Sequence, residues 1–334
     1  MEDLFGHRIS YLRVSITDRC NERCHYCMPA EEQAWVPRSE ILSYEEILRV
    51  LKVGAGLGIR KVRVTGGEPL TRRDVVWFCE QVGRIEGIDD VGLSTNGTLL
   101  ARTIPDGRTT AQALVEAGVR TVNISLDTLD PVGYQSTTGR DLWDEAVAGI
   151  DAAREAGFAK IKLNTVLMRN RNEHELWDLV AFAGERGLLL RFIELMPVSD
   201  AQVLTDENFL PIAEARRILE FRLGALTPRP DFRTNGPASY YEIPGSGQII
   251  GFIGAMTNLH FCESCNKLRL TAEGKLRPCL GSHLEFDIRE VLRDPATTDD
   301  DLARFFQHVV ARKPEQHDFR ENYQPGRKMV AIGG

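Results

Sequence analysis

A strand–turn–helix pattern repeats over residues 11–195 and restricts the fold more than any other feature of the chain. Each unit has a short strand rich in β-branched residues, a polar turn and then a helix. Such repeats predict an α/β fold with a parallel sheet, either a barrel or a doubly wound open sheet. Six units, rather than the eight of a closed barrel, favour a partial (βα)6 TIM-type barrel. We predict the six strands at Tyr11–Thr17, Lys61–Thr65, Val91–Thr95, Thr121–Leu126, Lys160–Leu167 and Leu189–Leu195.

Helices are expected between these strands. Ser43 and Glu46 have the spacing of a capping box at the start of the first helix. Glycines follow four of the helices, where a left-handed residue is common. The five helices are predicted near Tyr44–Ala55, Arg72–Ile85, Ala111–Glu116, Leu142–Ala156 and Glu173–Arg186.

Unusual residues follow each of the first four strands. They are three cysteines, then Gly66–Pro69, Thr95–Gly97 and Ser125–Asp127. Chemistry in parallel α/β folds collects at the carboxyl ends of the strands. We therefore expect the functional site at this edge of the sheet.

The repeat stops after Pro197, which predicts a barrel domain of residues 1–197 and a second segment of residues 198–334. The second segment should contain a helix over Pro211–Leu223 and β-hairpins over residues 240–281, with turns at 245–247 and 273–275. A helix is expected at Asp301–Arg312. Residues 104–110 should form a surface loop.

The composition bounds the kind of protein. A net charge of −7 argues against a general nucleic-acid or anionic-membrane binder. No apolar run has the length of a membrane span, and the first residues lack the features of a secretory signal. We therefore expect a cytoplasmic enzyme whose seven cysteines are reduced thiols. Cys79, in an apolar helical stretch, is interpreted as a core thiol.

The first cysteine group, Cys20, Cys24 and Cys27, places three thiols within eight residues. Two metal centres suit this spacing. One is a zinc site with a fourth ligand nearby, such as His25. The other is a cubane iron–sulfur cluster whose fourth iron has no protein ligand and can bind a small molecule.

The second group, Cys262, Cys265 and Cys279, spans a predicted hairpin. It suits a structural staple with His260 or His283 as fourth ligand, or a second cluster with an open iron that binds substrate. Lys267 and Arg269 alternate with leucines just after Cys265, so both cations should lie on one face of a strand.

Basic residues also stand between apolar neighbours in the predicted strands. Charges in a parallel sheet are costly unless they are paired. Internal carboxylates such as Glu194 could pair with them, but a polyanionic ligand in the barrel explains so many cations better. The residues are Arg13, Lys61, Arg63, Lys162 and Arg191.

The motif from Cys20 to Cys27, with Tyr26 before the last cysteine, resembles the signature of the radical S-adenosylmethionine superfamily. Gly66–Pro69 resembles its glycine-rich turn. This resemblance implies a [4Fe-4S] cluster whose open iron chelates S-adenosylmethionine and whose electron cleaves it to a 5′-deoxyadenosyl radical. Glycine suits such a turn because it allows close approach of the backbone to a ligand.

The whole chain is similar to the GTP 3′,8-cyclase family of molybdenum cofactor biosynthesis. The resemblance rests on Ser15–Cys20, Val64–Pro69, Arg191–Met196, the second cysteine group and the terminal Gly333-Gly334. It implies two [4Fe-4S] clusters, the second of which binds the guanine of GTP. The implied reaction starts with hydrogen abstraction from C3′ of the ribose. A bond then forms between C3′ of the ribose and C8 of the guanine, which gives 3′,8-cyclo-7,8-dihydro-GTP.

The resemblance also implies roles for individual residues, by their positions in the matching motifs. The match implies S-adenosylmethionine contacts at Tyr26, Gly67, Ser125 and Met196, and catalytic roles for Arg269, Gly333 and Gly334. One departure is Lys267, which stands where the family usually has arginine. A lysine keeps the positive charge but lacks the planar guanidinium that can donate two parallel hydrogen bonds to one ligand. The implied GTP contacts are Arg13, Arg63, Ser94, Lys162, Lys267, Leu268 and Arg269.

The resemblance also implies partners: a reductase or ferredoxin-type electron donor and a downstream cyclic pyranopterin synthase. No pattern in the chain decides the oligomeric state, a homodimer included. Two alternatives stay open from the sequence: a radical S-adenosylmethionine enzyme that modifies peptides and has an auxiliary cluster, or a non-enzymatic metal-binding sensor.

Overall fold

Six parallel strands in sequence order form the centre of the molecule. The computed structural model describes residues 1–28, 35–199, 203–319, 323 and 326–333. Each central strand is hydrogen-bonded to the next, and every pair is parallel. The strands are β1 (Tyr11–Ser15), β2 (Lys61–Thr65), β3 (Asp90–Thr95), β4 (Thr121–Ser125), β5 (Lys160–Leu167) and β6 (Leu189–Glu194).

The C-terminal strands extend this sheet at both edges. β9 (Ile249–Ile253) lies parallel to β6, while β10 (Lys267–Leu270) lies parallel to β1. Antiparallel strands continue outward from each: β8 (Ser239–Glu242) and β7 (Thr227–Pro228) beyond β9, and β11 (Lys275–Arg277) and β12 (Phe286–Asp287) beyond β10. The two predicted hairpins are therefore present, and the chain between β9 and β10 carries them to opposite edges.

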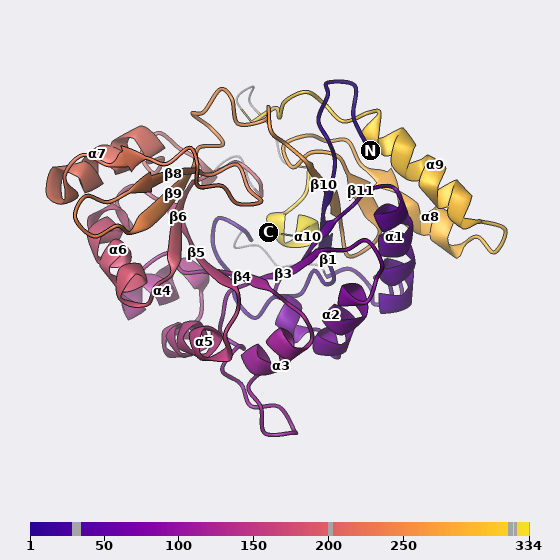
Figure 1. Ribbon diagram of the computed structural model, residues 1–334, viewed down its shortest axis with the longest axis horizontal. Coiled ribbons are helices and arrows are strands. Elements are labelled where there is room, and N and C mark those ends of the chain that lie inside the picture. The colour runs from indigo at the N-terminus through magenta and orange to yellow at the C-terminus, as the bar shows by residue number, and fades with distance from the viewer. Residues whose placement is uncertain (29–34, 200–202, 320–322, 324–325, 334) are drawn as a thin grey trace.

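The sheet curves, and the helices cover its convex side (Figure 1). The short helix α10 (Met329–Ile332) instead lies within the concave side, with the end of the chain beside it. This arrangement confirms the predicted partial barrel. The helices of the convex layer are α1 (Tyr44–Gly56), α2 (Val75–Gly83), α3 (Thr110–Glu116), α4 (Pro131–Thr138), α5 (Trp143–Ala156) and α6 (Leu176–Glu185).

The remaining helices belong to the C-terminal part. α7 (Ile212–Leu223) packs on α6, and α9 (Asp299–Val310) packs on α1 and on α8 (Ile288–Arg293). In α9 the capping box of Thr298 and Asp301 starts the helix two residues before the predicted position. Residues 104–107 form a largely exposed loop, and the loop ends at Thr109, the N-cap of α3.

Two predicted helices begin later than expected. Pro69–Thr71 and Glu173–Glu175 form short 3-10 turns, so α2 begins at Val75 and α6 at Leu176. Helix α4 was not predicted, although Asp130 caps it by accepting from Val132 and Gly133. Its glycine, serine and threonines have low helix propensity, so the sequence did not indicate a helix here.

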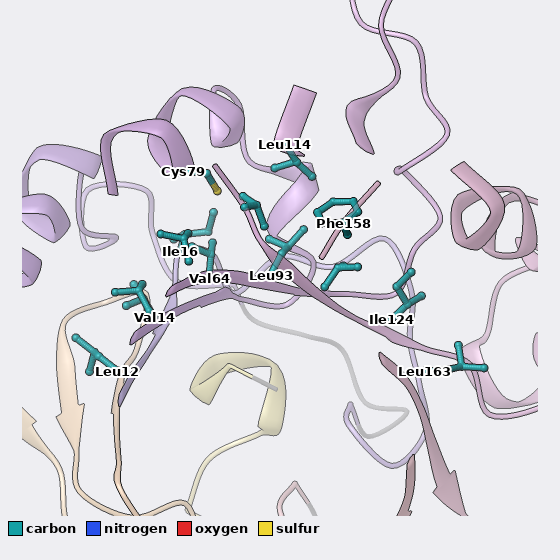
Figure 2. Packing of buried hydrophobic residues seen from close by; sticks show 14 of the residues in the cluster. Leu12, Val14, Ile16, Val64, Cys79, Leu93, Leu114, Ile124, Phe158 and Leu163 are labelled. Carbon is teal, nitrogen blue, oxygen red and sulfur yellow. The ribbon is translucent and has the colours of Figure 1, made fainter. Parts of the chain in front are cut away.

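Alternation along the strands separates a core from a polar interior. Leu12, Val14, Val64 and Leu93 are buried and point towards the helices, and α2 adds Cys79 to the same core (Figure 2). The residues between them point to the concave side, because successive side chains of a strand lie on opposite faces. Arg13 and Arg63 are two of these. The core position of Cys79 confirms that interpretation.

The predicted capping box is also present. Ser43 Oγ accepts from the amide of Glu46 at 3.1 Å, and Glu46 accepts from the amide of Ser43 at 2.7 Å. No helix among the described residues has the length and apolar character needed to cross a membrane.

Candidate active site

A cavity lies on the concave side of the sheet, and cations line it. Its wall includes side chains from β1 to β6 and from β10, together with Met329 of α10. No aspartate or glutamate is among the described residues that line it. Such a wall favours an anionic ligand. The six cations are Arg13, Arg63, Lys162, Arg191, Lys267 and Arg269.

Arginines of four neighbouring strands occupy one row of the sheet. Arg269 is in register with Arg13 on one side and with Arg277 on the other, and Arg13 is in register with Arg63. Gly92 continues the row on β3. A Cβ on this glycine would lie 2.5 Å from Cζ of Arg63, so glycine is required for the guanidinium to lie there.

Several of these cations are held by the protein itself. Arg63 donates from Nε to the Tyr11 hydroxyl at 3.0 Å, and its Nη atoms donate to Leu93 and Thr121. Arg191 donates twice to Oδ1 of Asn164, at 3.0 and 2.6 Å. These bonds fix where each positive charge lies.

The cations destabilise one another. Burial, followed by the charges of Arg191 and Arg63, lowers the pKa of Lys162 to about 7. Burial and the charge of Arg13 likewise lower the pKa of Arg269. Removing like charges from water and placing them together costs free energy, which a bound anion offsets.

Two residues discussed from the sequence lie elsewhere. The buried Glu194 does not pair with the cations; it accepts from the amides of Ile212, Met256 and Thr257 at 2.8–3.0 Å. Lys61 donates to Asn235 and is not part of the cavity wall. The alternative of ion pairing with Glu194 is therefore wrong.

The first cysteine group follows β1, at the carboxyl end of the strand. Burial raises the pKa of Cys24, and the negative charges of Glu22, Cys27, Asp127 and Cys20 raise it further. Burial raises the pKa of Cys27 to about 12, although its sulfur accepts a hydrogen bond from the amide of Val330. Thiols with such values bind as thiolates only when a metal centre supplies positive charge.

The first group supplies three thiols from one short loop. Cysteines that hold a cubane each bind a different iron, so three of them leave the fourth iron without a protein ligand. His25 lies with Nδ1 3.2 Å from the carbonyl oxygen of Thr137. The three thiols thus fit a cluster with one open iron.

Gly66–Pro69 packs against the loop that carries Cys20. The amide of Gly67 donates to the carbonyl of Thr17 at 2.7 Å, and a Cβ on Gly67 would lie 2.4 Å from the carbonyl oxygen of Arg19. Glycine is therefore needed here for contact with the cysteine loop, before any ligand is considered. Glu68 accepts from Thr95 and from the amide of Asn96, both at 2.8 Å, and so joins this turn to the end of β3.

Of the other predicted site residues, three line the cavity and two, Tyr26 and Leu268, do not. Ser94, Ser125 and Met196 line the cavity. Tyr26 donates from its hydroxyl to Oδ2 of Asp127 at 2.7 Å, beside the first cysteine group. Leu268 is fully buried in the hydrophobic core on the opposite face of β10, so only its main chain could reach a ligand in the cavity.

The second cysteine group lines the same cavity near the amino-terminal ends of the parallel strands. Cys262 and Cys265 precede β10, and Cys279 follows the antiparallel β11, so all three thiols lie at this end. Neither candidate for a fourth ligand lines the cavity. His260 lies beside Glu263 at 2.5 Å and is largely exposed, while the ring of His283 stacks on Tyr323. Three thiols that face a cavity fit a cluster with an open position.

The C-terminal tail reaches the cavity. The carbonyl of Gly333 accepts from Nη1 of Arg269 at 2.6 Å, and Gly334 lies outside the described residues. Ser199 joins this tail to the first cysteine group: its hydroxyl donates to the carbonyl of Cys27 at 2.7 Å and accepts from the amide of Met329 at 2.8 Å.

Some site residues were not found from the sequence. Tyr11, Asn123 and Asn164 line the cavity, and their alternation with apolar neighbours in β1, β4 and β5 was the available signal. Ser199 lies in a connection without regular structure. No pattern marked it.

Comparisons with known proteins agree with this architecture. Residues 14–183 match the model of the radical SAM superfamily, and residues 188–319 match Molybdenum Cofactor Synthesis C. The chain is 42% identical to a GTP 3′,8-cyclase of Thermodesulfovibrio yellowstonii, over 100% of both chains. It is 45% identical to one of Erythrobacter litoralis, over 99% of this chain and 98% of the other.

Solved structures share the fold. The structure of native anSMEcpe with bound AdoMet has a TM-score of 0.60 at 14% identity, covering 92% of this chain and 82% of that one. Streptococcus suis SuiB bound to precursor peptide SuiA has a TM-score of 0.60 at 16% identity, covering 98% and 76%. The full-length identity to the cyclases and the two family models show that the chain belongs to the GTP 3′,8-cyclase family of the radical SAM superfamily.

Proposed function

We propose that this protein is a radical S-adenosylmethionine enzyme that converts GTP to 3′,8-cyclo-7,8-dihydro-GTP, the first step of molybdenum cofactor biosynthesis. One observation carries the proposal. A cavity lined by six cations and by no described carboxylate has the second group of thiols in its wall, and Ser199 links Met329 of the same wall to Cys27 of the first group. A nucleoside triphosphate has the charge and the aromatic base that such a chamber accommodates.

Cys20, Cys24 and Cys27 would hold a [4Fe-4S] cluster, which with S-adenosylmethionine supplies the hydrogen-abstracting radical. Residues nearby would position that cosubstrate: Tyr26 through its bond to Asp127, Gly67 from the turn that packs against the cysteine loop, and Ser125 and Met196 from the cavity wall. Water exclusion by the curved sheet and α10 would protect the reactive species.

Cys262, Cys265 and Cys279 would hold a second [4Fe-4S] cluster at the far end of the cavity, where an open iron would bind the guanine base. The separation of the two cysteine groups then sets the orientation of GTP. The base lies at the end where the strands begin, and the ribose points towards the end where they finish.

The cations between the two groups would bind the triphosphate. Arg13, Lys162, Lys267 and Arg269 are the proposed direct contacts, with Ser94 and the main chain of Leu268 beside them. Arg63 already makes four hydrogen bonds from its five N–H groups to the protein, so its contribution is mostly its fixed charge.

Arg269, Gly333 and Gly334 are the proposed catalytic residues. The bond from Arg269 to Gly333 supports this assignment because it brings the tail to the cation that lies beside the second thiol group. We propose residue 197 as the division between the radical S-adenosylmethionine barrel and a C-terminal part with the second cysteine group, the substrate-binding strands and the Gly-Gly tail. This second part extends the sheet at both edges.

The two alternatives are less favoured. SuiB was solved with a precursor peptide, but the chain resembles it at 16% identity, a likeness of fold alone. The match to the cyclases is 42–45% over the full chain. A sensor without catalysis does not need a cationic chamber beside both thiol groups.

The proposal is tested with anaerobic, reduced protein incubated with S-adenosylmethionine and GTP. Cyclised nucleotide and 5′-deoxyadenosine should form together, and both should depend on GTP. Cys24→Ala should abolish both products, whereas Cys265→Ala should abolish cyclisation and leave slow, uncoupled formation of 5′-deoxyadenosine. Equal 5′-deoxyadenosine formation with and without GTP, and no cyclised nucleotide, would overturn the substrate assignment.

Partners follow from the proposed chemistry. The first cluster requires an electron from a reductase or ferredoxin-type donor, and the cyclised nucleotide requires a cyclic pyranopterin synthase as its consumer. We propose neither nucleic acid nor membrane as a partner. Sedimentation of the reconstituted enzyme tests whether it is a homodimer.

A further inference from the structure

A buried ammonium group lies between the two chain segments that carry the second cysteine group. Lys313 follows α9, and only 3% of its surface is exposed. Its Nζ donates to the carbonyl of Pro278 at 2.6 Å and approaches the carbonyl of Lys267 at 3.4 Å. Pro278 immediately precedes Cys279, and Lys267 comes two residues after Cys265. One side chain thus joins both arms of the group.

The same ammonium reaches a thiol as well as the main chain. Lys313 donates a hydrogen bond to the sulfur of Cys265. The two carbonyls that it also approaches belong to Pro278, next to Cys279, and to Lys267, two residues after Cys265.

None of the partners that Lys313 has among the described residues is a carboxylate. They are two carbonyls and a thiol, and none of the ion pairs among the described residues includes it. A buried ammonium without a counter-charge is costly. Three thiolates around a resting cubane core leave a net negative charge at this place, and that charge would compensate the ammonium.

We propose that Lys313 is a positioning residue of the second cluster site: it holds the Cys265 and Cys279 arms together and supplies the fixed positive charge that balances the cluster. The inference rests on the second cluster of the proposed function and goes beyond it by assigning a residue outside the cysteine and substrate motifs. Since reduction adds negative charge to a cluster, a nearby cation makes reduction more favourable.

The test isolates the second site. In a Cys20→Ala, Cys24→Ala, Cys27→Ala parent protein, only the second group can hold iron. Lys313→Met removes the charge and the donors with little change in volume, and Lys313→Arg keeps both. Lys162→Met is the matched control, because it removes another buried lysine, one that lies on β5 in the cavity wall. Each protein is reconstituted anaerobically.

Two quantities are measured: the rate of iron loss to a chelator, and the midpoint potential from a titration followed by electron paramagnetic resonance. Lys313→Met should lose iron about 10-fold to 100-fold faster than the parent, the usual effect of removing a group that supports metal ligands. Its midpoint potential should be more negative. Lys313→Arg should restore at least the potential, and Lys162→Met should match the parent in both.

The possible failures are distinguishable. A parent protein without iron at the second site would overturn the second cluster of the proposed function, and Lys313 with it. A parent with a normal cluster, and a Lys313→Met variant with the same iron loss and the same potential, would overturn the role of Lys313 alone. Lys313→Met in the chain with all cysteines should keep the first cluster, which shows that it folds; loss of both clusters together, also in Lys313→Arg, would reduce Lys313 to a packing role.

Discussion

The guanidinium of Arg269 donates a 2.6 Å hydrogen bond to the carbonyl oxygen of Gly333, 64 positions later in the chain. This bond fixes the end of the C-terminal tail against the row of arginines in the cavity. Gly333 has a positive φ of 87°, and a Cβ there would lie 2.9 Å from Cβ of Ser15 and Cγ2 of Thr65. The tail is therefore fitted between Arg269 and the strands β1 and β2.

Arg269→Ala should lower cyclisation by about 30-fold or more, because truncating one partner of a buried charged contact costs about 2–5 kcal/mol. Both clusters should assemble normally, since Arg269 is a ligand of neither. Product formation and iron content are measured on the same preparation, with the exposed Arg84→Ala as control. Loss of iron in Arg269→Ala would show that this residue is structural.

Ser199→Ala should loosen the tail without removing its other contacts. The hydroxyl of Ser199 is the bridge between the amide of Met329 and the carbonyl of Cys27, and a bridge of this kind contributes about 1 kcal/mol for each bond. Amide hydrogen exchange of residues 329–333 should become about 5-fold to 30-fold faster. Ser246→Ala, in the exposed turn after β8, is the control and should leave this exchange unchanged.

Binding of GTP should take up a proton above pH 7. Lys162 has a pKa of about 7 in the free protein, lowered by burial and then by Arg191 and Arg63, so it loses its charge as the pH rises. A bound triphosphate stabilises the ammonium and raises this pKa. The affinity should then fall with rising pH, by at most about tenfold per unit.

Calorimetry between pH 7 and 9, in two buffers of different ionisation enthalpy, measures this proton uptake. The last phosphate ionisation, with a pKa of about 6, lies below that range. Lys162→Met should bind GTP more weakly at pH 7 and take up fewer protons. Equal proton uptake by both proteins would contradict the assignment to Lys162.

Gly67→Ala should prevent assembly of the first cluster and spare the second. Its Cβ would lie 2.4 Å from the carbonyl oxygen of Arg19, so the backbone beside Cys20 must move. Gly56→Ala is a matched control, because a Cβ at the end of α1 meets nothing within 4 Å. Iron analysis should give about half the iron of the unchanged protein for Gly67→Ala and the full amount for Gly56→Ala. Full iron in Gly67→Ala would contradict the prediction.

Local patterns were enough for much of the fold. The β-branched runs located six parallel strands, and Ser43 with Glu46 located the start of α1, because backbone propensity and capping act between near neighbours. The same locality explains the errors. The capped but glycine- and threonine-rich α4 was missed, and α2 was started three residues early because a 3-10 turn and a positive φ at Asp74 precede it.

By itself, the sequence determined the parallel barrel core, the two groups of three thiols and the basic residues that alternate with apolar ones within the strands. These features depend on the spacing and the periodicity of residues along the chain. Tertiary structure alone decided that β9 and β10 join opposite edges of the sheet, that Arg277, Arg269, Arg13 and Arg63 form one row, and that Ser199 and Lys313 reach the cysteine groups. Such contacts join residues far apart in the chain, and they exist only once folding has closed the loops between them.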